Sequence, residues 1–138
     1  MKPVSLITTV RNESQSIREF MDALLNQSRM PDEIVIVDGG SSDDTVEILR
    51  REYEDKHSFV RVLECEGNIA KGRNYAIENA RYDVIAVTDA GCKTDKEWLK
   101  NLTQPFEEDN PPDVVGGVSK ADNRTAFNQV TGAYLTVT

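Results

Sequence analysis

Short, continuously apolar runs that alternate with segments of helical periodicity constrain the fold of this chain more than any other feature. An apolar run without alternating polar residues predicts a strand buried on both faces, which is typical of parallel sheets covered by helices. The runs that predict strands cover residues 4–10, 33–37, 59–63, 83–87 and 114–118. With helical segments between them, this βαβαβαβαβ order predicts an α/β fold with a doubly wound, mostly parallel, Rossmann-like sheet and right-handed crossovers.

The four intervening segments are expected to be helices. Ser14 and Ser42 are the predicted N-caps of the first two, and Thr94 with Glu97 forms a capping-box pair for the fourth. The second helix is expected over residues 43–56 and the third over residues 68–80. The residues expected on the core faces are Ile17, Phe20, Met21, Leu24 and Leu25 of the first helix, Ile69, Ala76, Ile77 and Ala80 of the third, and Trp98, Leu99, Leu102 and Phe106 of the fourth.

Length and composition indicate one globular domain over residues 1–138. The net charge of −8 argues against a nucleic acid polymer as partner, because such binding needs a basic stripe. A run of about 20 apolar residues, the length that spans a bilayer, is absent, and we expect no signal peptide. Two cysteines are too few for a disulfide framework, so we expect a cytoplasmic protein, or one on the cytoplasmic face of a membrane.

Polar residues follow three of the expected strands at their carboxyl ends. In doubly wound sheets, ligands bind at this edge, where the strand order reverses. Carboxylates there can accept hydrogen bonds from a base or a ribose, and an arginine can bind phosphate with two parallel hydrogen bonds. This pattern predicts a site for a nucleoside diphosphate. The candidate residues are Thr9, Arg11 and Glu13 after the first strand, Asp38 after the second, Asp89 after the fourth, and Arg73 in the third helix.

Four blocks of the sequence resemble one known family in order and spacing. They are residues 4–13, residues 37–45 (VDGGSSDDT), residues 67–74 (GNIAKGRN) and residues 88–91 (TDAG). Together they closely resemble family 2 glycosyltransferases of the GT-A fold, in which the last block carries an Asp-x-Asp motif. The resemblance covers almost the whole chain.

The resemblance implies a Leloir-type glycosyltransferase that uses a nucleoside diphosphate sugar. It further implies inverting transfer to a hydroxyl of a sugar or lipid-linked acceptor, with Mg²⁺ or Mn²⁺ holding the diphosphate. By position, Thr9, Arg11 and Glu13 would border the nucleoside, and Asp38 would bind the base. Arg73 would approach the base or diphosphate, and Asp89 would meet the ribose or the metal. An acid after the second strand suits the imide of uracil, which favours UDP and leaves GDP open.

Two positions depart from the family pattern. The second acid that often follows the position of Asp38 is replaced by Gly39. The second acid of the Asp-x-Asp motif is replaced by Gly91, so Asp89 is the one candidate metal ligand. A single carboxylate can still hold Mg²⁺ or Mn²⁺ when substrate phosphates supply other ligands.

Each candidate also has an ordinary structural role. Thr9 suits a strand because it is β-branched, and Arg11 can form a surface ion pair with Glu13. Glu13 can instead favour the start of the first helix. Asp38 and Asp89 are both residues that open turns. Arg73, like Lys71 before it, can be a solvated helix charge.

A rival hypothesis is a non-catalytic nucleotide-binding module with the same fold. We find no convincing general base, and the spacing of Phe127, Val130, Tyr134 and Leu135 indicates an unfinished element. We therefore expect a fragment of a longer enzyme, whose acceptor side, catalytic base and any membrane anchor would follow residue 138. A receiver domain is excluded because it needs paired acids after the first strand. The glycine motifs of P-loop and dinucleotide-binding proteins are absent.

Overall fold

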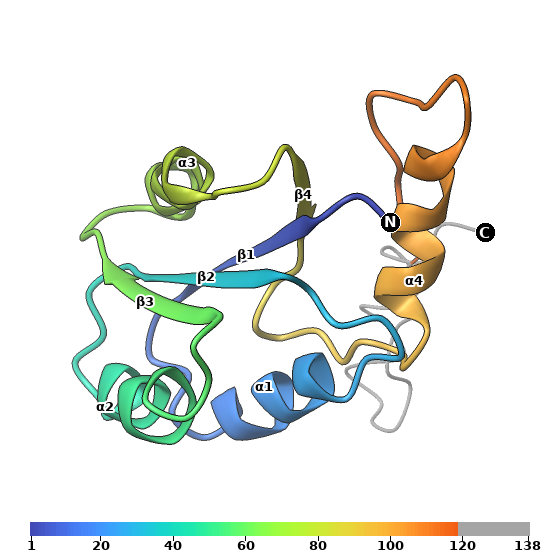
Figure 1. Ribbon diagram of the computed structural model, residues 1–138. Helices are drawn as coiled ribbons and strands as arrows, with labels where there is room; N and C mark the ends of the chain where they lie inside the picture. Colours follow the sequence, from blue (N-terminus) through green and yellow to red (C-terminus); the bar gives the residue numbers. More distant parts are fainter. Residues whose placement is uncertain (119–138) are drawn as a thin grey trace, which may run out of the picture.

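The computed structural model describes residues 1–118, which form a sheet of parallel strands with helices on both faces (Figure 1). The spatial order of the strands is β3-β2-β1-β4, and every neighbouring pair is parallel. The predicted α/β fold with a parallel sheet is therefore confirmed. The strands are β1 (Val4–Val10), β2 (Glu33–Asp38), β3 (Val60–Glu64) and β4 (Val84–Val87).

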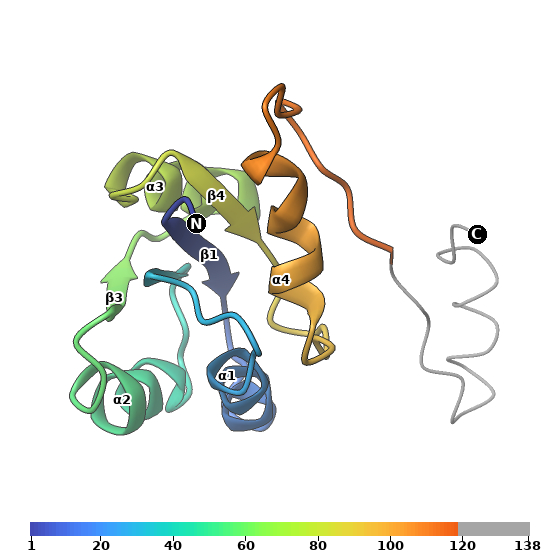
Figure 2. The same ribbon diagram turned by 45° about the vertical axis from the view of Figure 1, so that its right-hand side comes forward.

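Helices lie on both sides of this sheet. Figure 1 shows α1 (Ile17–Leu25) and α2 (Thr45–Leu49) on one side and α3 (Ile69–Asn79) on the other. A π-helical turn, η1 (Arg50–Glu54), extends α2. The fourth helix, α4 (Trp98–Thr103), lies beside β4 and continues into a 3₁₀ turn, η2 (Gln104–Glu107) (Figure 2). Within residues 1–118, no helix has the length and apolar character needed to cross a bilayer.

Two apolar cores result from this layering. The smaller one joins the sheet to α3 through Ile7, Val35, Val37 and Ala76. Every residue of β2 is buried, and the apolar run 34–37 between its charged ends, Glu33 and Asp38, agrees with a strand covered on both faces. The larger core lies between the sheet and the remaining helices and contains Val4, Leu6, Val10, Ile17, Phe20, Met21, Leu24, Ile34, Ile36, Ile48, Leu49, Tyr53, Val60, Val62, Ala86, Ala90 and Leu99.

The inner face of α3 differs from the predicted one. Ala76 is fully buried as expected, but Ile69 and Ile77 are 64% and 42% exposed. Gly72 is buried instead, and a β-carbon on it would lie 3.1 Å from Cγ2 of Thr9. The small side chains at positions 72 and 76 let the helix backbone approach the sheet closely, so the stripe through them faces inward and the two isoleucines face outward.

Replacing Gly72 by valine should lower the free energy of unfolding by about 2 kcal/mol, because the added methyl groups overpack the contact with β1 and β2. A β-carbon would also lie 3.6 Å from Cγ1 of Val37, so neither neighbouring strand offers space. Chemical denaturation measures the difference. Gly116→Val is the matched control, because nothing lies within 4 Å of a β-carbon at that position. Equal stability of the two variants would contradict this account of the packing.

The fifth predicted strand does not form in the described part of the chain. Residues 114–118 have no strand assignment, and Val114 and Val118 are 83% and 80% exposed. Strand propensity reflects how well a side chain fits a half-buried sheet surface, and this segment pairs with none of the four strands. The prediction of an unfinished element around residues 127–135 lies outside the described residues.

The predicted helix starts were wrong in three places. Helix α1 begins at Ile17 rather than after Ser14, and α2 begins at Thr45 rather than after Ser42. The expected capping box of α4 is absent, because Oγ1 of Thr94 accepts a hydrogen bond from Nε2 of Gln27 (3.3 Å) instead. Longer-range partners occupy the groups that local capping rules would use. At α3, by contrast, Oδ1 of Asn68 accepts a hydrogen bond from N–H of Lys71 (2.8 Å).

Candidate nucleotide-binding site

The order of the strands places a topological switch point between β1 and β4. The chain steps outward from β1 through β2 to β3, and then returns to place β4 on the opposite side of β1. Parallel pairing brings all four carboxyl ends to one edge, where Val10 is opposite Asp38 and Asp38 is opposite Glu64. Thr9, Asp38 and Asp89 therefore reach the same edge of the sheet, at which doubly wound folds bind ligands.

Arg73 and Asp89 meet at this edge. Nη2 of Arg73 lies 3.3 Å from Oδ1 of Asp89, and the two side chains are 41% and 66% exposed. The pair connects the first turns of α3 to the segment after β4. Exposed ion pairs contribute little to stability, so both groups can be exchanged for ligand contacts at small cost. The pair thus places one cation and one anion beside the switch point.

Asp38 is turned into its own loop. Its side chain is nearly fully buried, and its Oδ2 accepts hydrogen bonds from N–H of Gly40 (3.0 Å) and of Ser41 (2.9 Å). Its Oδ1 accepts a third, from the hydroxyl of Ser41. Within residues 1–118, Asp38 forms no hydrogen bond with Arg73 or Asp89, and β1 lies between β2, which ends at Asp38, and β4, which Asp89 follows. The turn role that the sequence left open for Asp38 is present, and base binding stays a prediction.

The loop after β1 is tied to the loop after β2 by hydrogen bonds that the sequence did not reveal. Asn12 has a φ of 52°, a left-handed value that asparagine tolerates better than most residues. Its N–H donates to Oγ of Ser41 (2.8 Å), and its Oδ1 accepts from N–H of Ser42 (2.8 Å). In the sequence, the one local signal for this arrangement is the asparagine that closely follows the first strand, because asparagine is enriched at positive φ.

Asp43 makes a second connection between these loops. Its carboxylate accepts hydrogen bonds from N–H of Ser14 (3.2 Å), from N–H of Thr45 (3.0 Å) and from the Thr45 hydroxyl. The Thr45 hydroxyl in turn accepts from N–H of Glu13 (2.9 Å). The hydrogen bond from the Thr45 hydroxyl is the largest cause that lowers the pKa of Asp43 to about 2, with smaller contributions from the two backbone segments. Asp43 therefore stays ionised throughout the neutral range.

The remaining candidates lie on β1 and the loop after it. Thr9 is half-buried against Gly72 of α3. Arg11 is exposed, and residues 1–118 contain no ion pair between it and Glu13. Oε2 of Glu13 accepts a hydrogen bond from the Ser16 hydroxyl (2.9 Å), which is the alternative role at the start of α1. The described structure therefore leaves Arg11 available to a ligand.

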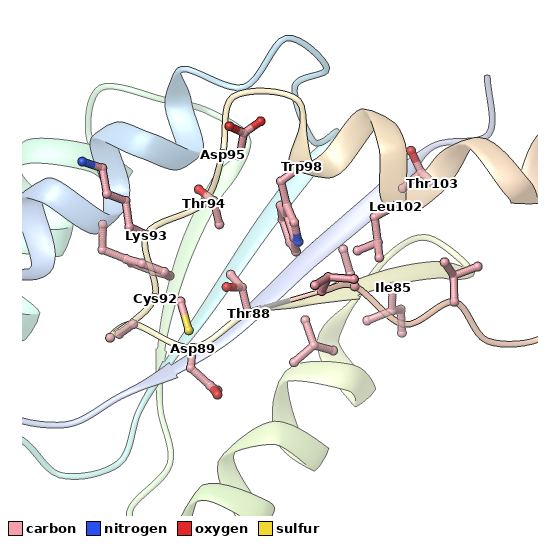
Figure 3. A pocket seen from close by; sticks show the side chains of 18 of the residues that line it. Ile85, Thr88, Asp89, Cys92, Lys93, Thr94, Asp95, Trp98, Leu102 and Thr103 are labelled. Carbon is pink, nitrogen blue, oxygen red and sulfur yellow. The ribbon is translucent and has the colours of Figure 1, made fainter. Parts of the chain in front are cut away.

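A groove of about 1300 Å³ runs along β4 towards α4. Figure 3 shows Asp89, Thr88 and Cys92 together, with Trp98 and Leu102 from α4 facing the same space. Asp89 is the one sequence-predicted site residue that lines this groove. The sequence missed the groove because its walls come from segments that are separate in the chain, namely β4, α4 and residues 113–118.

The chemistry of Asp89 fits the divalent cation that the resemblance implies. Residues 1–118 contain no group of three or more His, Cys, Asp or Glu side chains able to hold a metal ion. Mg²⁺ is commonly held by one or two carboxylates together with substrate phosphates, rather than by a cage made only of protein ligands. Asp89 offers one exposed carboxylate, so it fits a metal whose other ligands come from the diphosphate and water.

The open parallel sheet carries an exposed acid and a cation at its switch point, which is where doubly wound α/β folds bind their ligands. The chain matches the family model described as "Glycosyl transferase family 2" over residues 5–136. The chain therefore belongs to glycosyltransferase family 2, as its four sequence blocks predicted.

Individual relatives agree with this assignment. The chain is 27% identical over 125 residues to poly-beta-1,6-N-acetyl-D-glucosamine synthase from Staphylococcus epidermidis. The aligned residues make up 90% of this chain and 30% of the relative. It is 30% identical over 119 residues to glycosyltransferase AglE from Haloferax volcanii, covering 83% of this chain and 38% of AglE. The chain thus spans about a third of the length of these curated relatives.

Solved structures place the fold in the same group. Residues 1–349 of TarS from S. aureus, solved in complex with UDP-GlcNAc, match with a TM-score of 0.63 and 30% identity over 72% of this chain and 29% of that chain. A mannosyltransferase from Pyrobaculum calidifontis, solved with GDP-Man and Mn²⁺, matches with a TM-score of 0.69 and 26% identity over 78% of this chain and 33% of that chain. These matches confirm the GT-A fold over part of its length.

Proposed function

We propose that this domain binds the nucleoside diphosphate sugar of a glycosyltransferase that transfers the sugar, with inversion, to a hydroxyl of a sugar or lipid-linked acceptor. The observation that carries the proposal is the Arg73–Asp89 pair at the switch point of the sheet. Family membership supports the reaction class, and the complexes of two relatives with UDP-GlcNAc and GDP-Man support the donor class.

In this proposal the exposed groups of the site contact the donor. Arg73 leaves Asp89 and binds a phosphate oxygen, because a guanidinium gains two parallel charge-assisted hydrogen bonds there. Asp89 would contact the ribose or hold Mg²⁺ or Mn²⁺, and a bound cation there would supply positive charge to the diphosphate leaving group. Thr9, Arg11 and Glu13 border the nucleoside, and Asp38 belongs to the part of the site that receives the base.

The transfer itself requires a base that removes the proton of the acceptor hydroxyl. No residue of the described part is assigned to this role, and we propose that the acceptor side of the complete enzyme supplies it. We propose UDP as the nucleotide, and the complex of the relative TarS with UDP-GlcNAc supports this choice. Two free cysteines, Cys65 and Cys92, are consistent with the proposed cytoplasmic setting.

Nucleoside diphosphates and their sugars should raise the melting temperature of the chain when Mg²⁺ or Mn²⁺ is present. A ligand at a hundredfold excess over its dissociation constant stabilises a folded protein by about 2.7 kcal/mol. A thermal-shift series with UDP, GDP, UDP-GlcNAc and GDP-mannose, each with metal and with EDTA, measures the effect. Adenosine monophosphate serves as the control for unspecific nucleotide effects.

The absence of any shift beyond that control would contradict the proposed donor site. A shift without donor hydrolysis or transfer by the complete protein would favour the alternative, a non-catalytic nucleotide-binding module.

A further inference from the structure

We infer that Asn12, Asp38 and Ser41 are positioning residues that lock the loop after β1 to the loop after β2, and that Asp38 acts on the nucleotide through this lock rather than by contact. The inference rests on the proposed function. The loop lock is the set of hydrogen bonds that joins Asn12, Asp38, Ser41 and Ser42.

The first observation is the state of the Asp38 carboxylate. A carboxylate offers about four acceptor positions, and three of those of Asp38 receive hydrogen bonds from Gly40 and Ser41. The side chain is also 2% exposed, so little of it can reach a ligand without opening the loop. Its hydrogen bonds instead fix the backbone of residues 39–41, which is the part of this loop that faces outward.

The second observation is a relay of hydrogen bonds through Ser41. The Ser41 hydroxyl donates to Asp38 and accepts from N–H of Asn12, so one hydroxyl connects the two loops and has both its donor and an acceptor in use. The side chain of Asn12 adds a second hydrogen bond between the two loops, because its Oδ1 accepts from N–H of Ser42. Each loop therefore contributes both a backbone donor and a side-chain acceptor to the lock.

The third observation is that the lock lies beside Arg11 and is connected to the segment before α3. Arg11 directly precedes Asn12, and its exposed guanidinium forms no ion pair within residues 1–118. The N–H of Gly39 donates to the carbonyl of Val10 (2.9 Å), and the carbonyl of Gly39 accepts from N–H of Gly67 (3.4 Å). The segment before α3, which carries Arg73, is thus connected to the same loop. Preorganised contacts of this kind raise affinity by reducing the ordering cost of binding.

The experiment compares dissociation constants of UDP and GDP, measured by titration calorimetry with Mn²⁺, across variants of the full chain. Ser41→Ala and Asn12→Gly each remove one connection, and glycine retains the positive φ of position 12. Both should weaken binding about tenfold, and Ser41→Thr should restore it, because threonine keeps the hydroxyl. Asp44→Asn is the matched control, since its side chain makes no capping hydrogen bond at the same loop.

Asp38→Asn separates positioning from contact. The amide oxygen still accepts from the N–H groups of Gly40 and Ser41, and the amide NH₂ can donate to the Ser41 hydroxyl, which then accepts instead of donating. A positioning role therefore predicts binding within about threefold of wild type, whereas Asp38→Ala loses about tenfold or more. Amide hydrogen exchange of residues 39–41 without nucleotide should accelerate in Ser41→Ala and Asn12→Gly but not in Asp44→Asn.

Unchanged dissociation constants in Ser41→Ala and Asn12→Gly would overturn the inference, and so would a loss in Asp38→Asn as large as that in Asp38→Ala. If wild type binds neither nucleotide, the proposed function fails, whereas nucleotide binding that is insensitive to the lock overturns only this inference.

Discussion

Replacing Glu33 by alanine should lower the free energy of unfolding by about 3 kcal/mol, because it breaks a buried ion-pair network and leaves its donors unpaired. The side chain of Glu33 is 3% exposed at the start of β2. Its carboxylate accepts hydrogen bonds from the Ser5 hydroxyl (2.9 Å), N–H of Arg81 (2.9 Å) and Nη1 of Arg61 (3.1 Å). One carboxylate therefore joins β1, β2, β3 and the segment before β4.

Urea denaturation measures this loss, and Glu64→Ala is the control. Glu64 forms an ion pair with Arg50 (3.1 Å), but both side chains are about half exposed, so its removal should cost less than about 1 kcal/mol. A comparable loss in the two variants would contradict the assignment of Glu33 as the central buried charge.

The effect of Glu33 should also depend on pH. Burial raises the pKa of Glu33, but the hydrogen bonds from Arg81, Ser5 and Arg61 outweigh it and hold the pKa below its ordinary value of 4.5. A lowered pKa in the folded state stabilises the fold fully above pH 4.5, and this contribution is lost as the pH falls through the folded value. The difference between wild type and Glu33→Gln should therefore shrink in acid.

Replacing Asp89 by asparagine should weaken metal-dependent nucleotide binding by at least about 100-fold, because the amide lacks the charge of the one candidate metal ligand. Calorimetry with UDP and GDP in Mn²⁺ measures the loss, and the same titrations in EDTA should show little difference between variant and wild type. Asp95→Asn is the control: it lines the same groove, and its Oδ1 accepts from N–H of Glu97. Unchanged affinity in Asp89→Asn would remove Asp89 from the site.

The strands were predictable because their cause is local. A sheet covered on both faces needs continuously apolar strands, and the runs at residues 4–10 and 33–37 coincide with β1 and β2 to within one residue. The segment at 114–118 (VVGGV) is also apolar, but it contains two glycines, which weaken a strand, and it pairs with no described strand. The start of α2 was missed because N–H of Ser42 bonds to Asn12, 30 residues earlier in the chain.

In the candidate site, too, some features have a local cause in the sequence and others depend on contacts between distant residues. The positions of Arg73 and Asp89 follow from strand ends and from the start of α3, so sequence alone brought them to one edge of the sheet. Their ion pair depends on how closely α3 lies against β1, which only the structure reports. The role of Asp38 depends on which of its neighbours it bonds to, and the sequence left both of its roles open.

The absence of a side chain at Gly72 also determines where the next residue along the helix can reach. The backbone of α3 rests almost directly on Thr9, so the origin of the Arg73 side chain is held at a fixed height above the sheet. A larger residue at position 72 would lift the helix axis and draw the guanidinium away from the end of β4. Gly72, a residue outside the proposed ligand contacts, thereby sets how far the guanidinium of Arg73 extends towards the end of β4. The position from which Arg73 would bind a phosphate then depends on the distance between α3 and the sheet.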